Sequence, residues 1–330
     1  MFQPLSTQRV MHREFQKAYD FARGIVERSV EGERLIAMLL GVPRQGKSLI
    51  SELLLADFPS CSVQGLQVIP IVRVVTPTRP TKKAMAEAII DALDKRRYGR
   101  YTAEQATARA SFLLKSAKVR VLLFDEIQHV VERNTARSWY EVADWLKTLS
   151  DGLNLSLLLV GLPAAREILS VNHQLRDRAT SPHIIYPYNW NHPADIKEFC
   201  RCLLSVSEVL AQQGYTLPSM TDLDLVWRCY AATHGRYGMV VKLFEEARHQ
   251  AQKAKVKTIT MQALADAFQV SVGDEGEVGN PFESDAELSD SVLVQRYVAL
   301  LNESGLKAPR QKRVQKSTSG DASVDGGGQR

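Results

Sequence analysis

Short apolar runs alternate with amphipathic stretches through the first 190 residues of the chain. A run such as LIAMLL at 35–40 has the length and continuity of a strand buried on both faces. Strands of this kind, separated by helices, are typical of a parallel α/β sheet covered on both sides. The other predicted strands are 68–75, 119–124, 155–161 and 183–186, and the predicted helices are 9–30, 47–57, 81–93, 103–117 and 138–150.

The pattern changes twice in the second half of the chain. After Pro193 it becomes helical to about residue 270, which predicts a second, α-helical domain. From about 272 it is acidic and Gly-rich, then briefly amphipathic, then basic and polar, as in segments that stay disordered without a partner. We therefore expect an α/β core over 1–190, a helical domain over 191–271 and a flexible, partner-binding tail over 272–330.

Composition restricts the compartment more than the activity. A net charge of +5 permits a nucleic-acid partner but does not require one. The four cysteines form no CxxC pair and no zinc-ligand cluster, as expected for free thiols in a reducing compartment. Because the longest apolar runs are too short to span a bilayer and the N-terminus does not resemble a signal peptide, we expect a cytoplasmic protein without a membrane partner.

Residues 41–48 read GVPRQGKS and fit the phosphate-loop pattern GxxxxGK[ST] between a predicted strand and a predicted helix. Loop N–H groups and the helix N-terminus favour phosphate oxygens, Lys47 would reach the β- and γ-phosphates, and Ser48 would bind magnesium. The alternative is a Gly-rich turn with a solvated lysine. The predicted cofactors are ATP and Mg2+, and the predicted nucleotide-binding residues are Gly41, Val42, Pro43, Arg44, Gln45, Gly46, Lys47, Ser48 and Leu49.

The predicted strand VRVLLF ends in two adjacent carboxylates, Asp125 and Glu126. In a phosphate-loop protein this pattern indicates that Asp125 contacts magnesium, usually through water, and that Glu126 polarises the attacking water. The alternative for Asp125 is a helix N-cap. His129 could orient Glu126 or the water, or could be an ordinary surface histidine.

With both motifs present, the chain resembles the AAA+ ATPases and, more closely, the transposon target-selection regulators TnsC and TniB. The shared segments include GVPRQGKS, LLFDEIQHV, WLKTLSDGLNLSLLLVGLPAAREIL and NHQLRDRATSPHIIYPYNW. The resemblance extends over about residues 10–282. It implies a five-stranded AAA+ core with a helical lid. It also implies ATP-dependent assembly of rings or filaments on duplex DNA that join a target-selection complex to the transposase.

The resemblance also implies roles for particular residues. Arg178 falls at the position of the arginine finger, which would enter the site of a neighbouring subunit. Arg176 is the near alternative for that role. If Arg178 is instead purely structural, we expect it to form an ion pair with Asp177. Asn154 and the end of the following strand lie near the usual first sensor position. In the lid, Met239 stands where these proteins place an arginine over the nucleotide, and Arg236 or Lys242 could substitute.

DNA contacts are predicted from charge alone. Lys82 and Lys83 begin a predicted helix shortly after Arg79, and DKRRYGRY at 94–101 combines cations with tyrosines. Such residues suit contacts to phosphates without base readout, although a run of charge is more often a solvated face. The predicted DNA-binding residues are Arg79, Lys82, Lys83, Arg96, Arg97 and Arg100.

The leading hypothesis is thus a DNA-transposition regulator that hydrolyses ATP, forms a homo-oligomer on duplex DNA and contacts transposase subunits and a target-selection complex. The main alternative is an AAA+ replication initiator or helicase loader. A protein-remodelling ATPase and a nucleotide-binding signalling switch are the other classes. For 280–301, one hypothesis is a segment that docks on the transposition machinery, and the other is a strap that packs on its own lid.

Overall fold

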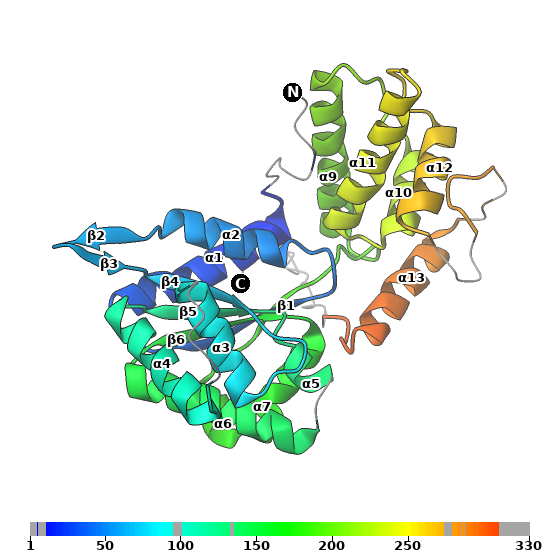
Figure 1. The fold of residues 1–330 in the computed structure, drawn as a ribbon. Coiled ribbons are helices and arrows are strands. Elements are labelled where there is room, and N and C mark those ends of the chain that lie inside the picture. The colour runs from blue at the N-terminus through cyan, green and yellow to red at the C-terminus, as the bar shows by residue number, and fades with distance from the viewer. Residues whose placement is uncertain are drawn as a thin grey trace, which may run out of the picture.

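Five strands form one parallel sheet, as predicted, and their order is β4–β5–β6–β1–β7 (Figure 1). The structure is a computed structural model that describes residues 5, 11–94, 101–132, 135–273, 279–284, 286 and 288–309. The strands are β1 (Ile36–Gly41), β4 (Ile71–Val75), β5 (Val121–Asp125), β6 (Ser156–Gly161) and β7 (His183–Ile185).

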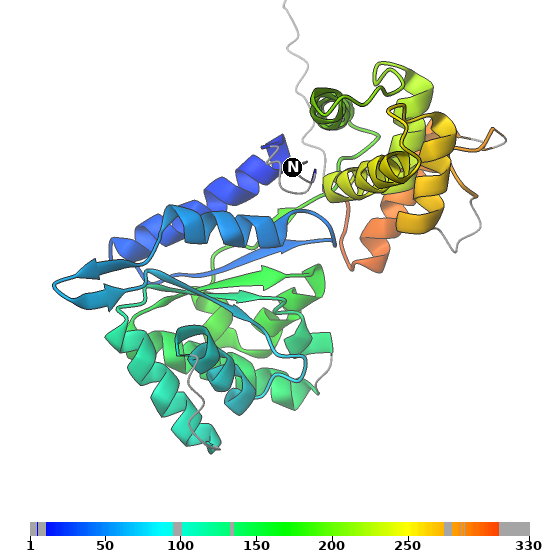
Figure 2. The same ribbon diagram turned by 45° about the horizontal axis from the view of Figure 1, so that its top comes forward.

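Helices cover both faces of the sheet (Figure 2). Side chains alternate between the faces, so that Ala37 and Leu39 pack beneath α1 (Arg13–Val30) and α2 (Lys47–Asp57). Met38 and Leu40 point into the opposite layer, which contains α3, α4 and α6. That layer comprises α3 (Lys82–Leu93), α4 (Ala103–Ser116) and α6 (Ala136–Leu153), with the short elements α5 (His129–Glu132), η2 (Pro163–Glu167), α7 (Ile168–Val171) and α8 (His173–Arg178) nearby.

A small hairpin of β2 (Cys61–Val63) and β3 (Leu66–Val68) lies between α2 and β4 and was not predicted. Its turn residues Gln64 and Gly65 both have positive φ, which is the geometry of a tight two-residue hairpin turn. The hairpin projects from the core (Figure 1), and both strands are largely exposed. Its strands are too short and too exposed to carry the buried apolar pattern from which strands are recognised in a sequence.

The predicted helical segment forms a separate bundle above the sheet (Figure 1). Its apolar faces meet in a core of their own, in which Phe199, Tyr230 and Phe244 are almost fully buried. The bundle contains α9 (Pro193–Gln212), α10 (Leu223–Thr233), α11 (Tyr237–Lys253) and α12 (Met261–Ser271). None of the described helices is both long and apolar enough to cross a membrane.

A further helix, α13 (Asp290–Glu303), connects the bundle to the core. Leu293 joins the apolar core of the bundle, whereas Tyr297, Leu300 and Leu301 pack with Val42 of the phosphate loop. Of the two hypotheses for 280–301, the structure supports the strap, although this strap packs on the phosphate loop as well as on its own lid. The prediction of a flexible tail is therefore wrong for α13. The docking hypothesis assumed that the apolar face had nothing to cover, and the structure contradicts this because the face covers Val42.

Candidate active site

The phosphate-loop sequence forms the predicted turn between β1 and α2. Gly46 is the N-cap of α2 and adopts a left-handed conformation with φ of 80°. A Cβ atom there would lie 2.8 Å from the Phe15 ring, so glycine satisfies both the backbone geometry and the packing. Pro43, Arg44 and Ser48 are exposed, which leaves the outer side of the loop open to a ligand.

Lys47 is not a solvated lysine. Its side chain is buried, and Nζ donates to the carbonyl oxygens of Gly41 (2.8 Å) and Val42 (2.9 Å). Burial lowers the pKa of Lys47 to about 8, and the nearby charges of Glu126 and Asp125 oppose this shift. The loop thus holds the ammonium group close to the carboxylates, where it can meet phosphate oxygens.

Asp125 ends β5 and is only 3% exposed. Its Oδ1 accepts from the backbone N–H of Glu126 (3.0 Å), and its Oδ2 accepts from Nη2 of Arg73 (2.6 Å). Because α5 begins only at residue 129, Asp125 is not the N-cap of that helix. Its buried place at the carboxyl end of a central strand suits a carboxylate that faces a bound metal.

Glu126 has the positive φ of 57°, which is uncommon for a residue with a side chain and turns the chain sharply after β5. Gln128 Nε2 donates to its carboxylate, and Gln128 Oε1 accepts from the backbone N–H of Leu162 (3.0 Å) after β6. His129 instead makes a hydrogen bond with the carbonyl of Thr76 through Nδ1 (3.1 Å). The residue that contacts Glu126 is therefore Gln128, and the suggestion for His129 is not supported.

A cavity of about 1020 Å³ lies between the phosphate loop and the helical bundle. The loop residues and Glu126 line one side, and Tyr237, Gly238 and Lys242 of α11 line the other. His12 and Phe15 add aromatic surface near Tyr237, which suits a nucleobase. The backbone N–H of Gly238 donates to the Arg44 carbonyl (3.1 Å), so the bundle touches the phosphate loop directly and stands as a lid over it.

The residues of the lid divide between two cavities. Lys242 lines the nucleotide cavity, whereas Arg236 lines a neighbouring cavity of about 980 Å³. Met239 is buried within the lid, at 7% exposed. Asn154 caps the end of α6 just before β6 begins, at the edge of the sheet opposite the phosphate loop. Asn154 therefore cannot serve as a sensor for this cavity.

The donor set fits a nucleotide with magnesium. The loop offers N–H groups and the Lys47 ammonium to phosphates. Magnesium prefers one or two carboxylates, substrate phosphates and retained waters to an all-protein cage. Asp125 and the exposed Ser48 hydroxyl match that preference, and no cluster of three or more His, Cys, Asp or Glu suited to a metal occurs in the described part of the chain.

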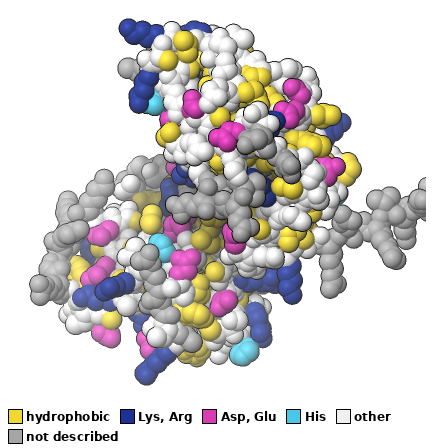
Figure 3. Space-filling model, turned by 90° about the vertical axis from the view of Figure 1, so that its right-hand side faces the viewer, with side chains coloured by type: hydrophobic (Ala, Val, Ile, Leu, Met, Phe, Trp, Pro, Cys, Tyr) yellow, Lys and Arg dark blue, Asp and Glu magenta, His cyan; other side chains and the backbone are white. Residues whose placement is uncertain are grey.

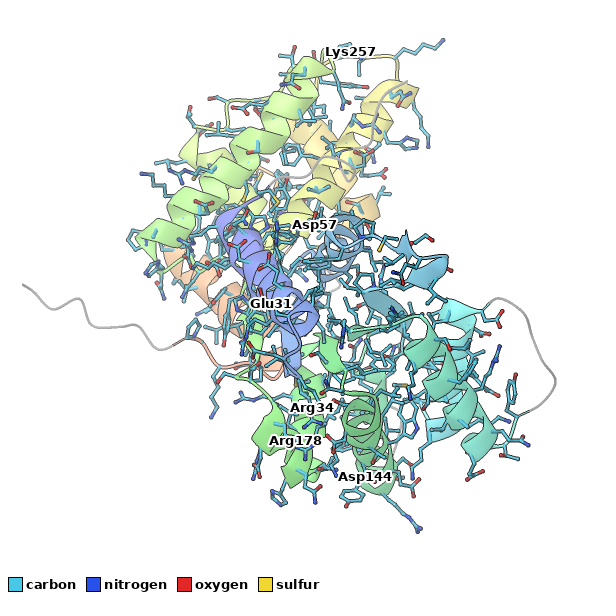
Figure 4. All side chains as sticks on the ribbon, turned by 90° about the vertical axis from the view of Figure 1, so that its left-hand side faces the viewer. Glu31, Arg34, Asp57, Asp144, Arg178 and Lys257 are labelled. Carbon is cyan, nitrogen blue, oxygen red and sulfur yellow. The ribbon has the colours of Figure 1, made fainter. Side chains whose placement is uncertain are left out.

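Arg178 lies outside the nucleotide cavity of its own chain. It donates to Asp151 of α6, and Asp151 also pairs with Arg34 (3.1 Å) and Lys147 (3.6 Å). Arg34 and Arg178 lie together on the core in Figure 4. The predicted alternative, an ion pair with Asp177, is made by Arg176 (3.6 Å). Arg178 is 40% exposed, which leaves it accessible to a second molecule.

The predicted DNA-binding residues are partly described. Arg79 is exposed in the loop after β4, and Lys82 and Lys83 begin α3, where Lys83 lies 3.7 Å from Glu87. On the face in Figure 3, basic side chains occur in separate groups among acidic and apolar ones. Arg96, Arg97 and Arg100 lie outside the described residues.

The family model of the bacterial TniB protein matches residues 7–186. The chain belongs to the TniB family. With this membership and its phosphate-loop core, the chain is a transposition-associated protein of the AAA+ ATPase class. A search of curated proteins found no match.

Solved structures support the AAA+ fold. The Cdc6p protein of Pyrobaculum aerophilum matches with a TM-score of 0.62 at 14% identity, covering 94% of this chain and 85% of that one. The Orc1 protein of Aeropyrum pernix, solved in complex with DNA, matches with a TM-score of 0.55 at 16% identity. That match covers 78% of this chain and 65% of the Orc1 chain, so the TniB-family chain spans slightly under two thirds of Orc1. At these identities the likeness concerns the fold alone.

Sequence reasoning missed Arg73 and Gln128. Arg73 carries a weak signal, because it is a charged residue inside the apolar run IVRVV. Gln128 carries none, because a glutamine two residues after Glu126 has no motif. His12, Phe15 and Tyr237 were also missed as cavity residues, since they meet only when the lid packs beside α1.

Proposed function

We propose that this TniB-family chain is an ATP-dependent regulator of DNA transposition that hydrolyses ATP, oligomerises on duplex DNA and links a target-selection complex to the transposase. The observation that carries the proposal is the cavity lined by both Lys47 and Glu126, with the buried Asp125 next to Glu126 at the end of β5. Family membership supports a role for this nucleotide site in transposition.

Each residue of the site has a role that its surroundings support. The loop N–H groups and Lys47 bind the phosphates, and Ser48 and Asp125 would hold Mg2+, which supplies positive charge to the phosphate oxygens. Glu126 lines the cavity and accepts from Gln128, so its carboxylate is oriented to take the proton of an attacking water. Lys242 is the lid cation placed to contact the nucleotide from above.

Arg178 completes the site of a neighbouring subunit in this proposal. A cation that reaches the γ-phosphate from a second molecule stabilises the charge that develops during phosphoryl transfer. Arg178 is exposed and lies outside its own cavity, which supports action between subunits. The residues 1–190 then act as the ATPase core, 191–271 as the lid, and 272–330 as a tail whose first part is the strap α13.

The DNA contacts proposed are Arg79, Lys82 and Lys83, with Arg96, Arg97 and Arg100 as the second cluster. A lysine at the start of a helix opposes the helix dipole, so Lys82 and Lys83 do not stabilise α3 by their position. A role in neutralising DNA phosphates would account for them. The alternative function, a replication initiator, shares the fold but would favour a particular duplex sequence.

The test measures particle size, nucleotide affinity and turnover together for three proteins on duplex DNA. The unmodified chain should bind ATP, assemble and turn over. Lys47→Ala should lose tight ATP binding and assembly, because the cation that faces the phosphates is gone. Glu126→Gln should bind ATP and stay assembled without turnover, because an amide does not act as a base. Normal ATP affinity in Lys47→Ala, or normal turnover in Glu126→Gln, would overturn the proposal.

A further inference from the structure

Arg73 is the one charged residue of β4, whose sequence is IVRVV. In the parallel pairing of β4 with β5, Arg73 lies opposite Leu123 and Val75 lies opposite Asp125. Residues two apart on a strand share a face, so Arg73 and Asp125 point toward the same side of the sheet. That side also holds Ile71 and Leu123, and it is covered by α1 and α2, the helix that begins with Lys47 and Ser48.

The contact between Arg73 and Asp125 uses one nitrogen of the guanidinium group. Nη2 donates to Oδ2 at 2.6 Å, while Nε is buried and has no hydrogen-bond partner among the described residues. Arginine–carboxylate pairs are frequently bidentate, with two parallel hydrogen bonds. The single contact therefore holds the carboxylate without using the full capacity of the guanidinium group.

A second carboxylate lies within reach of the same arginine. Nη1 of Arg73 is 4.0 Å from Oε1 of Glu52, which is one helical turn beyond Ser48 on α2. Glu52 is 60% exposed and lines the nucleotide cavity, whereas the Asp125 side chain is 4% exposed. Arg73 thus stands between a buried carboxylate at the proposed metal position and an exposed one at the rim.

We propose that Arg73 is a positioning residue that competes with Mg2+ for Asp125 and shifts toward Glu52 when metal and nucleotide bind. This rests on the proposed ATP and Mg2+ binding. A guanidinium group and a divalent cation at one carboxylate repel each other strongly in a buried setting. The competition makes the occupancy of the site depend on the free Mg2+ concentration. Arg73 also keeps Asp125 from being a buried unpaired charge before the metal arrives.

The experiment titrates Mg2+ against the full-length chain and measures binding of a fluorescent ATP analogue, with the melting temperature recorded in parallel. Arg73→Gln should lower the half-saturating Mg2+ concentration by about fivefold or more, because the competing cation is removed. Its melting temperature should also rise more on addition of Mg2+ and ATP than that of the unmodified chain. Glu52→Gln should raise the half-saturating concentration, because the shifted arginine loses its second partner.

Arg73→Lys is the matched control, since it keeps a positive charge beside Asp125 and should stay closer to the unmodified value than Arg73→Gln does. An unchanged or raised half-saturating concentration in Arg73→Gln would overturn the inference and leave the ion pair a structural one. If Arg73→Gln does not fold, Glu52→Gln decides, and an unchanged value in that variant overturns it. If the unmodified chain shows no Mg2+-dependent nucleotide binding, it is the proposed function that fails.

Discussion

Asp125 and Glu126 are neighbours in the sequence, yet the structure gives them different surroundings. Asp125 is buried and held by Arg73, whereas Glu126 lines the cavity and accepts from Gln128. A buried carboxylate with both oxygens held by hydrogen bonds suits a metal, whereas a carboxylate that lines a cavity can reach a bound substrate or water. The proposed division of roles between the two residues follows from these contacts.

His12 is a second residue whose state is set by its contacts. Its Nδ1 accepts from the backbone N–H of Phe15 (3.4 Å) as the N-cap of α1, so the Tyr188 hydroxyl 2.7 Å away must donate to the same nitrogen. Burial lowers the pKa of His12 to about 4, while Glu198 and Glu14 oppose that shift. The folded chain therefore holds His12 neutral at neutral pH.

We predict that His12 makes the chain less stable in mild acid. Between the unfolded pKa of about 6.5 and the folded pKa of about 4, the unfolded chain binds a proton that the folded chain does not. The free energy of unfolding should therefore fall as the pH drops from 6.5 toward 4, by on the order of 3 kcal/mol from this residue. Denaturant unfolding at several pH values measures the effect.

The control for that prediction is His12→Asn, which keeps an acceptor at the N-cap position and has no titrating group. Its free energy of unfolding should vary less with pH over the same interval. Equal pH dependence in the two proteins would show that His12 does not carry the effect.

Among the elements, α13 has the most consequence for the active site. Val42 in the phosphate loop is fully buried, and its cover comes from Tyr297, Leu300 and Leu301. The N-terminal half of the helix is tied to the lid. Trp190, which packs in the apolar core of the bundle, donates from Nε1 to Asp290 (2.7 Å), and Arg296 Nη1 donates to the Ala231 carbonyl (2.5 Å). The helix therefore links the phosphate loop to the lid.

We predict that Leu301→Ala weakens both the fold and nucleotide binding. Leu301 is 1% exposed, and truncating a buried leucine costs about 2–5 kcal/mol in free energy of unfolding. The loosened cover over Val42 should also lower the affinity for ATP, measured by titration under conditions where the chain stays folded. Val298→Ala is the matched control, because Val298 lies on the same helix and is 41% exposed. Equal effects from both substitutions would contradict the prediction.

At the scale of the whole molecule, the proposed subunit contact can be tested by mixing variants. Glu126→Gln keeps Arg178 but has an inactive site, and Arg178→Ala keeps an active site but lacks the cation. In an equal mixture that assembles at random, a subunit that keeps Glu126 receives Arg178 from its neighbour at about one site in four. The mixture should therefore recover up to about a quarter of normal turnover. Removing Arg178 should leave the fold intact, because Asp151 keeps Arg34 and Lys147 as partners. A mixture no more active than its components would exclude action between subunits.

DNA binding is expected to be electrostatic. Affinity should fall with salt with a log–log slope of about −0.9 per phosphate contacted, and it should vary little with duplex sequence. Replacing Lys82 and Lys83 with alanine should weaken binding equally for all sequences and reduce the slope by about 2. Replacing the exposed Lys115 and Lys253 is the control and should change little. A strong preference for one short sequence would favour the initiator alternative.

The sequence by itself determined the five strands of the sheet, the main helices of the core and the residue patterns of the proposed nucleotide site. The apolar strand runs, the GVPRQGKS turn and the carboxylates at the end of β5 are local patterns, which can be recognised from neighbouring residues alone. For the same reason the bounds of α3, α4 and β6 lie within a residue or two of those predicted.

Only the tertiary structure decided the partners of these groups. Arg73 and Asp125 are 52 residues apart, Arg178 and Asp151 are 27 apart, and Val42 meets α13 from the far end of the chain. Each contact depends on which strands are adjacent and how the lid and strap return to the core. A sequence pattern does not carry that information, because residues distant along the chain meet only when the whole packing arrangement forms.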